Sequence, residues 1–92
     1  MTSWCVYLIR CSDGSLYCGI TTDLRRRVQE HNEGIGSRYT RSRLPVLLVW
    51  SSKTFGKSEA YKEEYRIKRM SKAAKEKLVT DGSRDGITDS IP

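Results

Sequence analysis

The feature that most restricts the fold of this chain is a short polar turn between two apolar segments near its start. Residues 3–11 and 16–20 are rich in β-branched and aromatic side chains and enclose the polar sequence SDGS, which predicts a β-hairpin. A two-residue Asp-Gly turn would mix polar and apolar side chains on both faces. A three-residue SDG loop sorts them, with Gly14 left-handed in a G1 bulge and Cys11 opposite Ser15, so we predict the bulged hairpin.

In this register Tyr7 lies opposite Gly19, and side chains separate by face because neighbouring strand residues point in opposite directions. Tyr7, Ile9 and Tyr17 share one face. The other face is apolar and is predicted to pack into the core; it carries Trp4, Val6, Leu8, Leu16, Cys18 and Ile20.

Beyond the hairpin the pattern changes to helical spacing. Leu24, Val28 and His31 recur at helical intervals after a threonine in the N-cap position, and VLLVWSSK is a continuous apolar run typical of a central strand. Ser58 and Ser71 each precede a helical pattern as N-caps. The predicted elements are a helix at 23–33, a basic loop at 34–45, a strand at 46–53, and helices at 59–70 and 72–80.

Together these elements predict one small α+β domain over residues 1–80. Their order is ββαβαα, with a three-stranded antiparallel sheet flanked by helices. Residues 81–92 have no periodicity and are rich in Gly, Asp and Ser, so we expect a disordered tail without a function of its own.

Basic residues outnumber acidic ones by 17 to 11, which gives a net charge of +6. The excess lies in residues 1–80, which hold 16 basic and 8 acidic residues, whereas residues 81–92 hold three aspartates and one arginine. A body this basic indicates a polyanionic partner such as a nucleic acid. A surface charged only for solubility is the alternative.

The three cysteines are odd in number and contain no CxxC spacing, which indicates neither a disulfide framework nor a zinc site. A reducing compartment, the cytoplasm, is the expected location. No segment approaches the roughly 18 apolar residues of a membrane span, and the first residues lack the pattern of a signal peptide.

A candidate site comes from the hairpin face that carries Tyr7 and Tyr17. The helix after the hairpin presents Arg27 and His31 at positions i and i+4, hence on one side. Two phenols beside two cationic or titratable groups form a site for an anion. Taken singly, each tyrosine is more often an amphipathic surface residue and the histidine a half-buried polar residue. The consecutive Arg25 and Arg26 fan out around the helix and are expected in solvent or on phosphates.

The helix at 59–70 has a carboxylate, Glu64, within its apolar stripe. Burying a charge costs several kcal/mol unless a partner compensates, so we expect a basic residue or a divalent metal beside it. Spacing alone favours neither. Glu63 is rotated outward, and Tyr61 and Tyr65 are expected to pack along the helix rather than to stack on bases.

A basic segment between the first helix and the third strand interleaves cations with an aromatic ring and hydroxyl groups. This composition suits a phosphate backbone and one stacked base, although a solvated loop looks the same. The candidate nucleic-acid contacts here are Arg38, Tyr39, Arg41 and Arg43.

The motifs VYL at 6–8 and YCG at 17–19, followed by Arg27, His31 and Glu64, resemble the GIY-YIG nuclease superfamily. The segments DGSLYCGITTDLRRRVQEHNEG and EAYKEEYRIK are similar to its small stand-alone bacterial type. The resemblance implies a single-metal phosphodiesterase site built from Tyr7, Tyr17, Arg27, His31 and Glu64. Glu64 would hold Mg²⁺ or Mn²⁺, and the products would be a 5′-phosphate and a 3′-hydroxyl.

These inferences lead to a metal-dependent DNA endonuclease as the first hypothesis. Single-stranded or structurally irregular DNA, including branched DNA, is the expected substrate, with little sequence specificity because no element is evident that would enter a groove. Tyr7 is favoured as the base that deprotonates water, with Tyr17 and His31 as exchangeable alternatives. The competing hypotheses are a nucleic-acid-binding module of the same fold without turnover and, more remotely, a protein-interaction domain.

Overall fold

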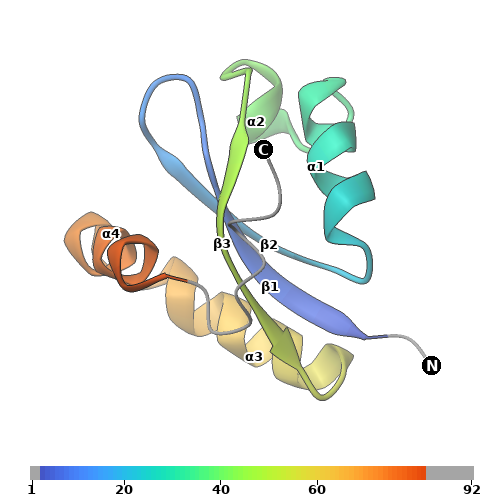
Figure 1. Cartoon of the computed structure of the whole chain (residues 1–92), viewed down its shortest axis with the longest axis vertical. Coiled ribbons are helices and arrows are strands. Elements are labelled where there is room, and N and C mark those ends of the chain that lie inside the picture. The colour runs from blue at the N-terminus through green and yellow to red at the C-terminus, as the bar shows by residue number, and fades with distance from the viewer. Residues whose placement is uncertain (1–2, 83–92) are drawn as a thin grey trace.

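The computed structural model describes residues 3–82 and is built on one antiparallel sheet of three strands (Figure 1). The central strand is β1 (Trp4–Arg10), with β2 (Leu16–Thr21) on one side and β3 (Leu47–Thr54) on the other. Strands β2 and β3 are therefore the two edge strands of this sheet, and each pairs with β1 along one side. The predicted α+β architecture is confirmed.

The hairpin between β1 and β2 has the predicted register. Tyr7 pairs with Gly19, and the backbone N–H of Cys11 donates to the carbonyl of Ser15 at 2.9 Å. Gly14 has a φ of +86°, the left-handed conformation that glycine adopts without steric penalty. The three-residue bulged loop is therefore confirmed.

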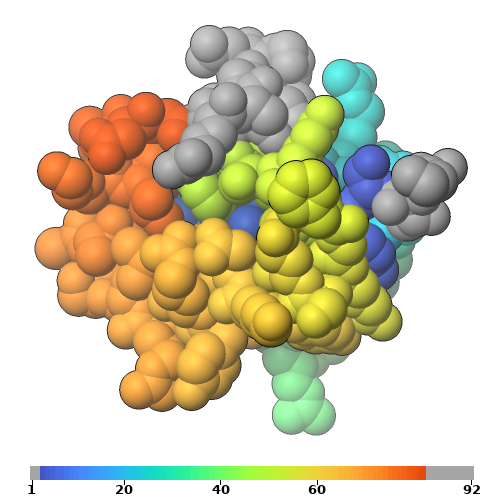
Figure 2. Space-filling view, turned by 90° about the horizontal axis from the view of Figure 1, so that it is seen from below, coloured from blue at the N-terminus to red at the C-terminus, as the bar shows by residue number. Residues whose placement is uncertain are grey.

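Helices cover both faces of the sheet. The two helices α1 (Leu24–Asn32) and α2 (Arg38–Arg41) lie on one face, and α3 (Lys57–Lys68) and α4 (Lys72–Asp81) lie on the other (Figure 1). Figure 2 looks onto the side covered by α3 and α4, drawn in yellow and orange. No helix within residues 3–82 is long and apolar enough to cross a membrane.

The segment at 34–45, predicted as a loop, contains the single helical turn α2. The hydroxyl of Ser37 caps this turn by accepting from the backbone N–H of Thr40 at 3.1 Å. A four-residue helix is too short to show a hydrophobic period. The capping serine was the only local signal of the turn.

Two predicted N-caps are wrong. The cap of α1 is Asp23, whose carboxylate accepts from the N–H of Arg26 at 3.1 Å, and not a threonine. Asp and Thr both suit this position, and the chain reaches it one residue later than the spacing predicted. In α3 the helix starts at Lys57 after Gly56, so Ser58 lies inside the first turn and caps nothing.

The last helix follows its prediction closely. Ser71 caps α4 by accepting from the N–H of Ala74 at 3.1 Å. The helix extends to Asp81, one residue beyond the predicted end, and Gly82 follows as its C-cap. The rest of the predicted tail, residues 83–92, lies outside the described residues.

Both faces of the sheet carry a packed core. The α3 and α4 face buries Val6, Leu8, Cys18, Trp50 and Ile67, and the α1 and α2 face buries Tyr7, Ile9, Cys11, Val46 and Leu48.

The expectation that Tyr61 and Tyr65 pack along the helix is wrong. Tyr61 is 52% exposed and Tyr65 is 65% exposed, because Ala60 and Ile67 supply the buried side of α3 and the two tyrosines point away from it.

Candidate active site

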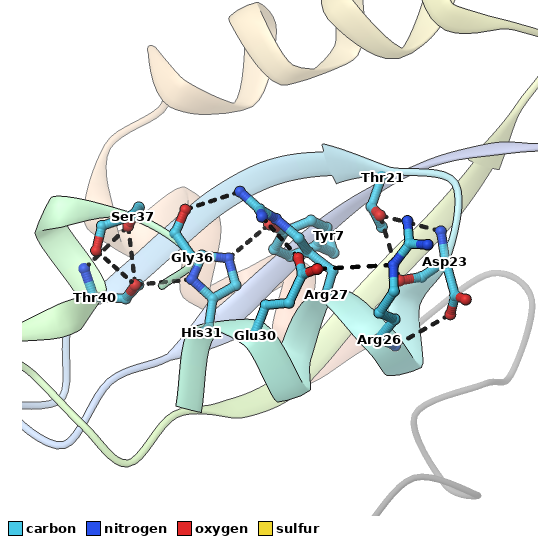
Figure 3. A network of polar contacts seen from close by, with 10 residues as sticks. All are labelled: Tyr7, Thr21, Asp23, Arg26, Arg27, Glu30, His31, Gly36, Ser37 and Thr40. Atoms are coloured by element: carbon cyan, nitrogen blue, oxygen red, sulfur yellow. Dashed lines mark hydrogen bonds and ion pairs between the residues drawn. The ribbon is translucent and has the colours of Figure 1, made fainter. Parts of the chain in front are cut away.

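The centre of the candidate site is a buried pair formed by Tyr7 and His31. Tyr7 projects from the middle of β1, and His31 from the last turn of α1. The phenol oxygen lies 2.9 Å from Nε2 of the imidazole, and both side chains are buried (Figure 3). The predicted face and helix spacing thus bring these two residues into direct contact.

The glycine opposite Tyr7 makes this position of the phenol possible. A Cβ atom at residue 19 would lie 2.5 Å from the phenol oxygen of Tyr7, far inside van der Waals contact. The phenol therefore rests against the bare backbone of Gly19. This explains physically why the second motif triplet ends in glycine.

The second ring nitrogen of His31 is also bonded. Nδ1 lies 2.8 Å from the hydroxyl of Thr40, which is fully buried in α2 and bonded to the hydroxyl of Ser37 at 2.9 Å (Figure 3). Burial, with the nearby charge of Arg27 adding to it, lowers the pKa of His31 to about 4. The imidazole is therefore neutral at pH 7, with one nitrogen donating and the other accepting.

Tyr7 keeps its proton at neutral pH. Burial raises the pKa of the phenol to about 12, although the guanidinium of Arg27 partly opposes the shift. A protonated phenol donates to Nε2 when the imidazole carries its hydrogen on Nδ1, and Nδ1–H then donates to Thr40. In this tautomer every polar atom of the chain from Tyr7 to Ser37 has a partner.

Arg27 reaches the same site from the middle of α1. Its Nη1 donates to Oε1 of Glu30 at 3.0 Å and its Nη2 to the carbonyl of Gly36 at 2.9 Å. The guanidinium is half-buried, whereas Arg25 and Arg26 are exposed. The predicted division of the three arginines between site and solvent therefore agrees with their exposure.

Tyr17 links the buried pair to the surface. Its ring meets that of His31 edge-on at 5.4 Å and stacks on Tyr39 at 5.9 Å with an interplanar angle of 22°. The guanidinium of Arg43 lies over the Tyr39 ring at 3.9 Å and also donates to Asp13 at 3.0 Å. Planar groups in contact with one another therefore connect the partly exposed Arg43 with the buried imidazole.

The remaining candidate nucleic-acid contacts are exposed side chains of the two helices on this face. Arg38 and Arg41 lie on α2, and Arg25 and Arg26 lie on α1. Exposed cations of this kind are able to contact a phosphate backbone.

Glu64 lies on the other side of the sheet from the four residues above. It belongs to α3, its side chain is 17% exposed, and its carboxylate pairs with Lys68 at 3.3 Å. Its charge acts on the thiol of Cys18, whose neighbour Tyr17 points to the opposite face. The edge strand β2 therefore separates Glu64 from the phenols, and within residues 3–82 no hydrogen bond or ion pair joins them.

The predicted compensating partner of Glu64 is thus a lysine. Among residues 3–82 no group of three or more His, Cys, Asp or Glu side chains is arranged to hold a metal. One carboxylate with an exposed, releasable lysine suits Mg²⁺, which is commonly held by one or two carboxylates, with waters and substrate phosphates in the other positions.

Two members of the site were missed by sequence reasoning. Thr40 orients His31, and Glu30 holds Arg27. The contact of Glu30 with Arg27 could have been predicted, since the two residues are three apart on a predicted helix. The contact of Thr40 with His31 could not, because it depends on how α2 packs against α1, and the sequence shows only the capping serine before Thr40.

The model of the GIY-YIG catalytic domain matches residues 3–77, most of the chain and all of the elements that carry the site. The chain therefore belongs to the GIY-YIG family, whose catalytic domain has a nuclease-like fold.

Several proteins to which the chain is similar carry the name UPF0213. The UPF0213 protein of Halobacterium salinarum is 56% identical over 73 residues, covering 79% of this chain and 95% of that protein. The UPF0213 protein YhbQ of Escherichia coli is 45% identical over 83 residues, covering 90% and 83%. The solution NMR structure of a UPF0213 protein from Bacillus halodurans has a TM-score of 0.55 at 44% identity, with 87% and 84% covered. An E. faecalis protein solved by the same method has a TM-score of 0.60 at 37% identity, with 88% and 86% covered.

Proposed function

We propose that this protein is a divalent-metal-dependent endonuclease that hydrolyses phosphodiester bonds of DNA. The observation that supports this most is the contact between the Tyr7 phenol and the neutral His31 imidazole at 2.9 Å, with Arg27 and Tyr17 beside it, inside a GIY-YIG catalytic domain. These groups suit the activation of water at a phosphate, because the neutral imidazole can accept a proton from the phenol and the guanidinium lies near both.

In this proposal Arg27 binds the scissile phosphate and stabilises the negative charge that grows on its oxygens in the transition state. Glu30 and the carbonyl of Gly36 hold the guanidinium in place, so little reorganisation is needed when the phosphate arrives. Its remaining N–H groups are available to the substrate.

The base is assigned to Tyr7 acting together with His31. With a pKa of about 12, the phenol does not lose its proton by itself at pH 7. It therefore has to take the proton of the attacking water as its own proton moves to Nε2 of His31. In the tautomer that leaves Nε2 free to accept, Nδ1–H donates to the hydroxyl of Thr40, which holds the ring in place. Tyr17, half-exposed at the mouth of the site, orients the water.

Glu64 is the residue proposed to hold Mg²⁺ or Mn²⁺. When bound, the ion supplies Lewis-acid stabilisation at the phosphate oxygens. Lys68 neutralises the carboxylate in its absence, and because this lysine is half exposed, it is free to turn toward solvent or a phosphate.

The proposed substrate is single-stranded or structurally irregular DNA. The exposed Arg25, Arg26, Arg38 and Arg41 bind the phosphate backbone without reading sequence. Cys11 and Cys18 are free thiols, which suits a reducing compartment, so we expect the protein to act in the cytoplasm.

The experiment compares four variants on end-labelled single-stranded, duplex and branched DNA with Mg²⁺, Mn²⁺ or EDTA. Arg27→Ala should lower the cleavage rate by about 10²–10³-fold, and Glu64→Ala should abolish metal-dependent cleavage. Arg66→Ala and Glu63→Ala, which remove the two partners of one ion pair on α3, are the matched controls and should retain most of the activity. Wild type that cuts none of the substrates, or a pair of site variants as active as their controls, would refute the proposal.

The alternative function is a nucleic-acid-binding module without turnover. The firmly protonated Tyr7 phenol and the Glu64–Lys68 ion pair are the observations that favour it. Tight, salt-sensitive DNA binding by wild type, with no cleavage under any of the metal conditions, would select this alternative.

A further inference from the structure

Helix α3 has two unlike flanks on either side of its buried Ala60 and Ile67. On one flank the charges neutralise each other. Arg66 donates from Nε and Nη2 to the two carboxylate oxygens of Glu63, at 2.9 and 3.0 Å. The other flank begins at Glu64 and continues outward through residues spaced four apart. We define these residues as the aromatic stripe: Lys57, Tyr61, Tyr65 and Arg69.

Members of the stripe lie on successive helical turns, about 6 Å apart along the axis. Both tyrosines are more than half exposed, so their rings contribute little to the core of this small domain. Figure 2 shows that the side of the molecule formed by α3 is open rather than covered by another described helix. The rings are therefore accessible to a ligand.

The cations of the stripe lie against its rings and not against acids. The ammonium of Lys57 is 5.4 Å from the Trp4 ring and 5.7 Å from the Tyr61 ring. The guanidinium of Arg69 is 5.3 Å from the Tyr65 ring and donates to its hydroxyl at 3.2 Å. Within residues 3–82 neither cation forms an ion pair, so this flank presents two uncompensated positive charges among aromatic faces.

We propose that the aromatic stripe is a binding track for single-stranded DNA, an inference that rests on the proposed function and specifies the strand it acts on. Bases stack on Tyr61 and Tyr65, and Lys57 and Arg69 move from the rings to the phosphates. Aromatic platforms interleaved with cations are the usual means of holding an unpaired strand. A duplex does not offer free base faces to such rings.

The chemistry of the stripe disfavours other partners. Its four members include no Leu, Ile, Val or Met, which a helix-in-groove protein contact would use as anchors. The spacing of about 6 Å between the tyrosines is nearly twice the rise of about 3.4 Å per nucleotide in one strand. The two rings therefore suit an extended strand or alternate bases of a stacked one.

The position of the stripe connects it to the candidate site. Glu64 directly precedes Tyr65 and lies near Cys18 on the edge strand β2, with Tyr17 on the other face of the same strand. A strand held on Tyr61 and Tyr65 therefore runs past Glu64 toward the open edge of β2. This would give the enzyme its preference for unpaired DNA without any base-specific contact.

The test measures binding of fluorescein-labelled oligo(dT) by fluorescence anisotropy in EDTA, so that binding is separated from cleavage. Tyr61→Ala and Tyr65→Ala should each weaken the affinity about tenfold, whereas Tyr61→Phe and Tyr65→Phe should retain it. Arg66→Ala, on the opposite flank, is the matched control and should change it less than about twofold. Affinity for a duplex of equal length should change little in the alanine variants.

Circular dichroism and thermal midpoints should be unchanged, because the tyrosines are exposed. If the alanine variants bind oligo(dT) as wild type does, the track is refuted. The proposed function would still hold in that case if wild type cleaves DNA and Glu64→Ala does not. If binding depends on the tyrosines but wild type cuts nothing, the proposed function fails and the track remains. Equal losses for duplex and single strand would also refute the track, since they would indicate simple phosphate binding.

Discussion

The two faces of the sheet are equally buried but chemically different. Alternate residues of the same strand serve them: Val6 and Leu8 enter the core under α3 and α4, while Tyr7 and Ile9 enter the core under α1 and α2. The first core is apolar throughout. The second contains a chain of hydrogen bonds from Tyr7 through His31 to Thr40.

The first core is therefore apolar packing beneath α3, the helix that carries Glu64, whereas the second core itself contains the phenol and the imidazole. Polar groups in a core are tolerated only when hydrogen-bonded, and a fully bonded network still adds little net stability compared with apolar packing. The α3 and α4 face demonstrates that this chain can build an apolar core. A buried phenol–imidazole pair on the other face is therefore best explained by function.

Leu8→Ala should have the largest effect on stability. Leu8 is fully buried in the apolar core, so its truncation should lower the free energy of unfolding by about 2–5 kcal/mol. The activity of the molecules that remain folded should be largely retained, because Tyr7 and His31 lie on the other face and Leu8 is not among the proposed reacting or binding groups. Urea unfolding and single-turnover cleavage measure the two quantities. If Leu8→Ala lost activity under conditions in which all of the protein is folded, the two faces would not be independent.

The polar core should show itself in the pH dependence of stability. The pKa of His31 is about 4 in the folded protein and about 6.5 in an unfolded chain, so the unfolded state binds more protons between these values. Stability is therefore fully present above about pH 6.5 and should fall as the pH drops to 4, by on the order of 3 kcal/mol. Urea unfolding from pH 7 to 4 measures the slope.

His31→Gln is the control for this prediction, because it removes the titrating group and keeps a hydrogen-bonding side chain. The variant should lose the slope between pH 6.5 and 5. An unchanged slope in this range would mean that another group is responsible. Below about pH 5 Glu76 adds a slope of its own, because hydrogen bonds from Arg10 and then Lys72 lower the pKa of its carboxyl to about 2 in the folded protein while the unfolded chain already takes up protons there. That contribution is common to wild type and His31→Gln, so the difference between the two isolates His31.

Gly19→Ala should have a smaller effect on stability and a large effect on activity. The added methyl group would lie 2.5 Å from the Tyr7 phenol oxygen, so the phenol must shift away from His31. Overpacking of this kind costs about 1–3 kcal/mol, and displacing a reacting group by about 1 Å lowers the rate about 100-fold.

Val6→Ala provides the comparison for Gly19→Ala, since it alters the neighbour of Tyr7 on the apolar face. It should destabilise the protein without changing cleavage by the folded fraction. If the two variants lost activity equally, a substitution on one face of the strand would also affect the other face. The two faces could then not be treated as independent.

The smallest effect is expected for Glu76→Gln. Arg10 donates to both carboxylate oxygens of Glu76, at 2.8 and 2.6 Å, and so ties the hairpin to α4. The pair is solvent-accessible, and exposed ion pairs stabilise little. The thermal midpoint should fall slightly at low salt, and the difference from wild type should shrink at 1 M salt. A difference independent of salt would mean that packing, rather than charge, holds α4.

Much of the fold was predictable because its signals are local. The hairpin register follows from alternation of side chains and one glycine, and the existence of α1 and the N-cap of α4 follow from spacing within a few residues. The turn α2 was missed because four residues carry no period. The outward direction of Tyr61 and Tyr65 was missed because the width of the buried side of α3 depends on the sheet beneath it.

The candidate site was predictable only in part for the same reason. Tyr7, Tyr17, Arg27 and His31 come from adjacent elements whose faces the spacing determines, so their convergence could be inferred. Thr40 joins them through a fold-back of α2 that no local pattern encodes. The partner of Glu64 was left open between a base and a metal, and the structure shows Lys68 one turn later.

The sequence alone determined the two faces of the hairpin, the basic body and the residues able to act on a phosphate, because these depend on composition and on spacing along one element. Only the tertiary structure decided that His31 is buried and neutral between Tyr7 and Thr40, that β2 separates Glu64 from the phenols, and that two tyrosines of α3 face solvent. These properties depend on burial and on contacts between distant elements, so a shifted pKa or the exposure of a side chain is decided only once those elements have packed.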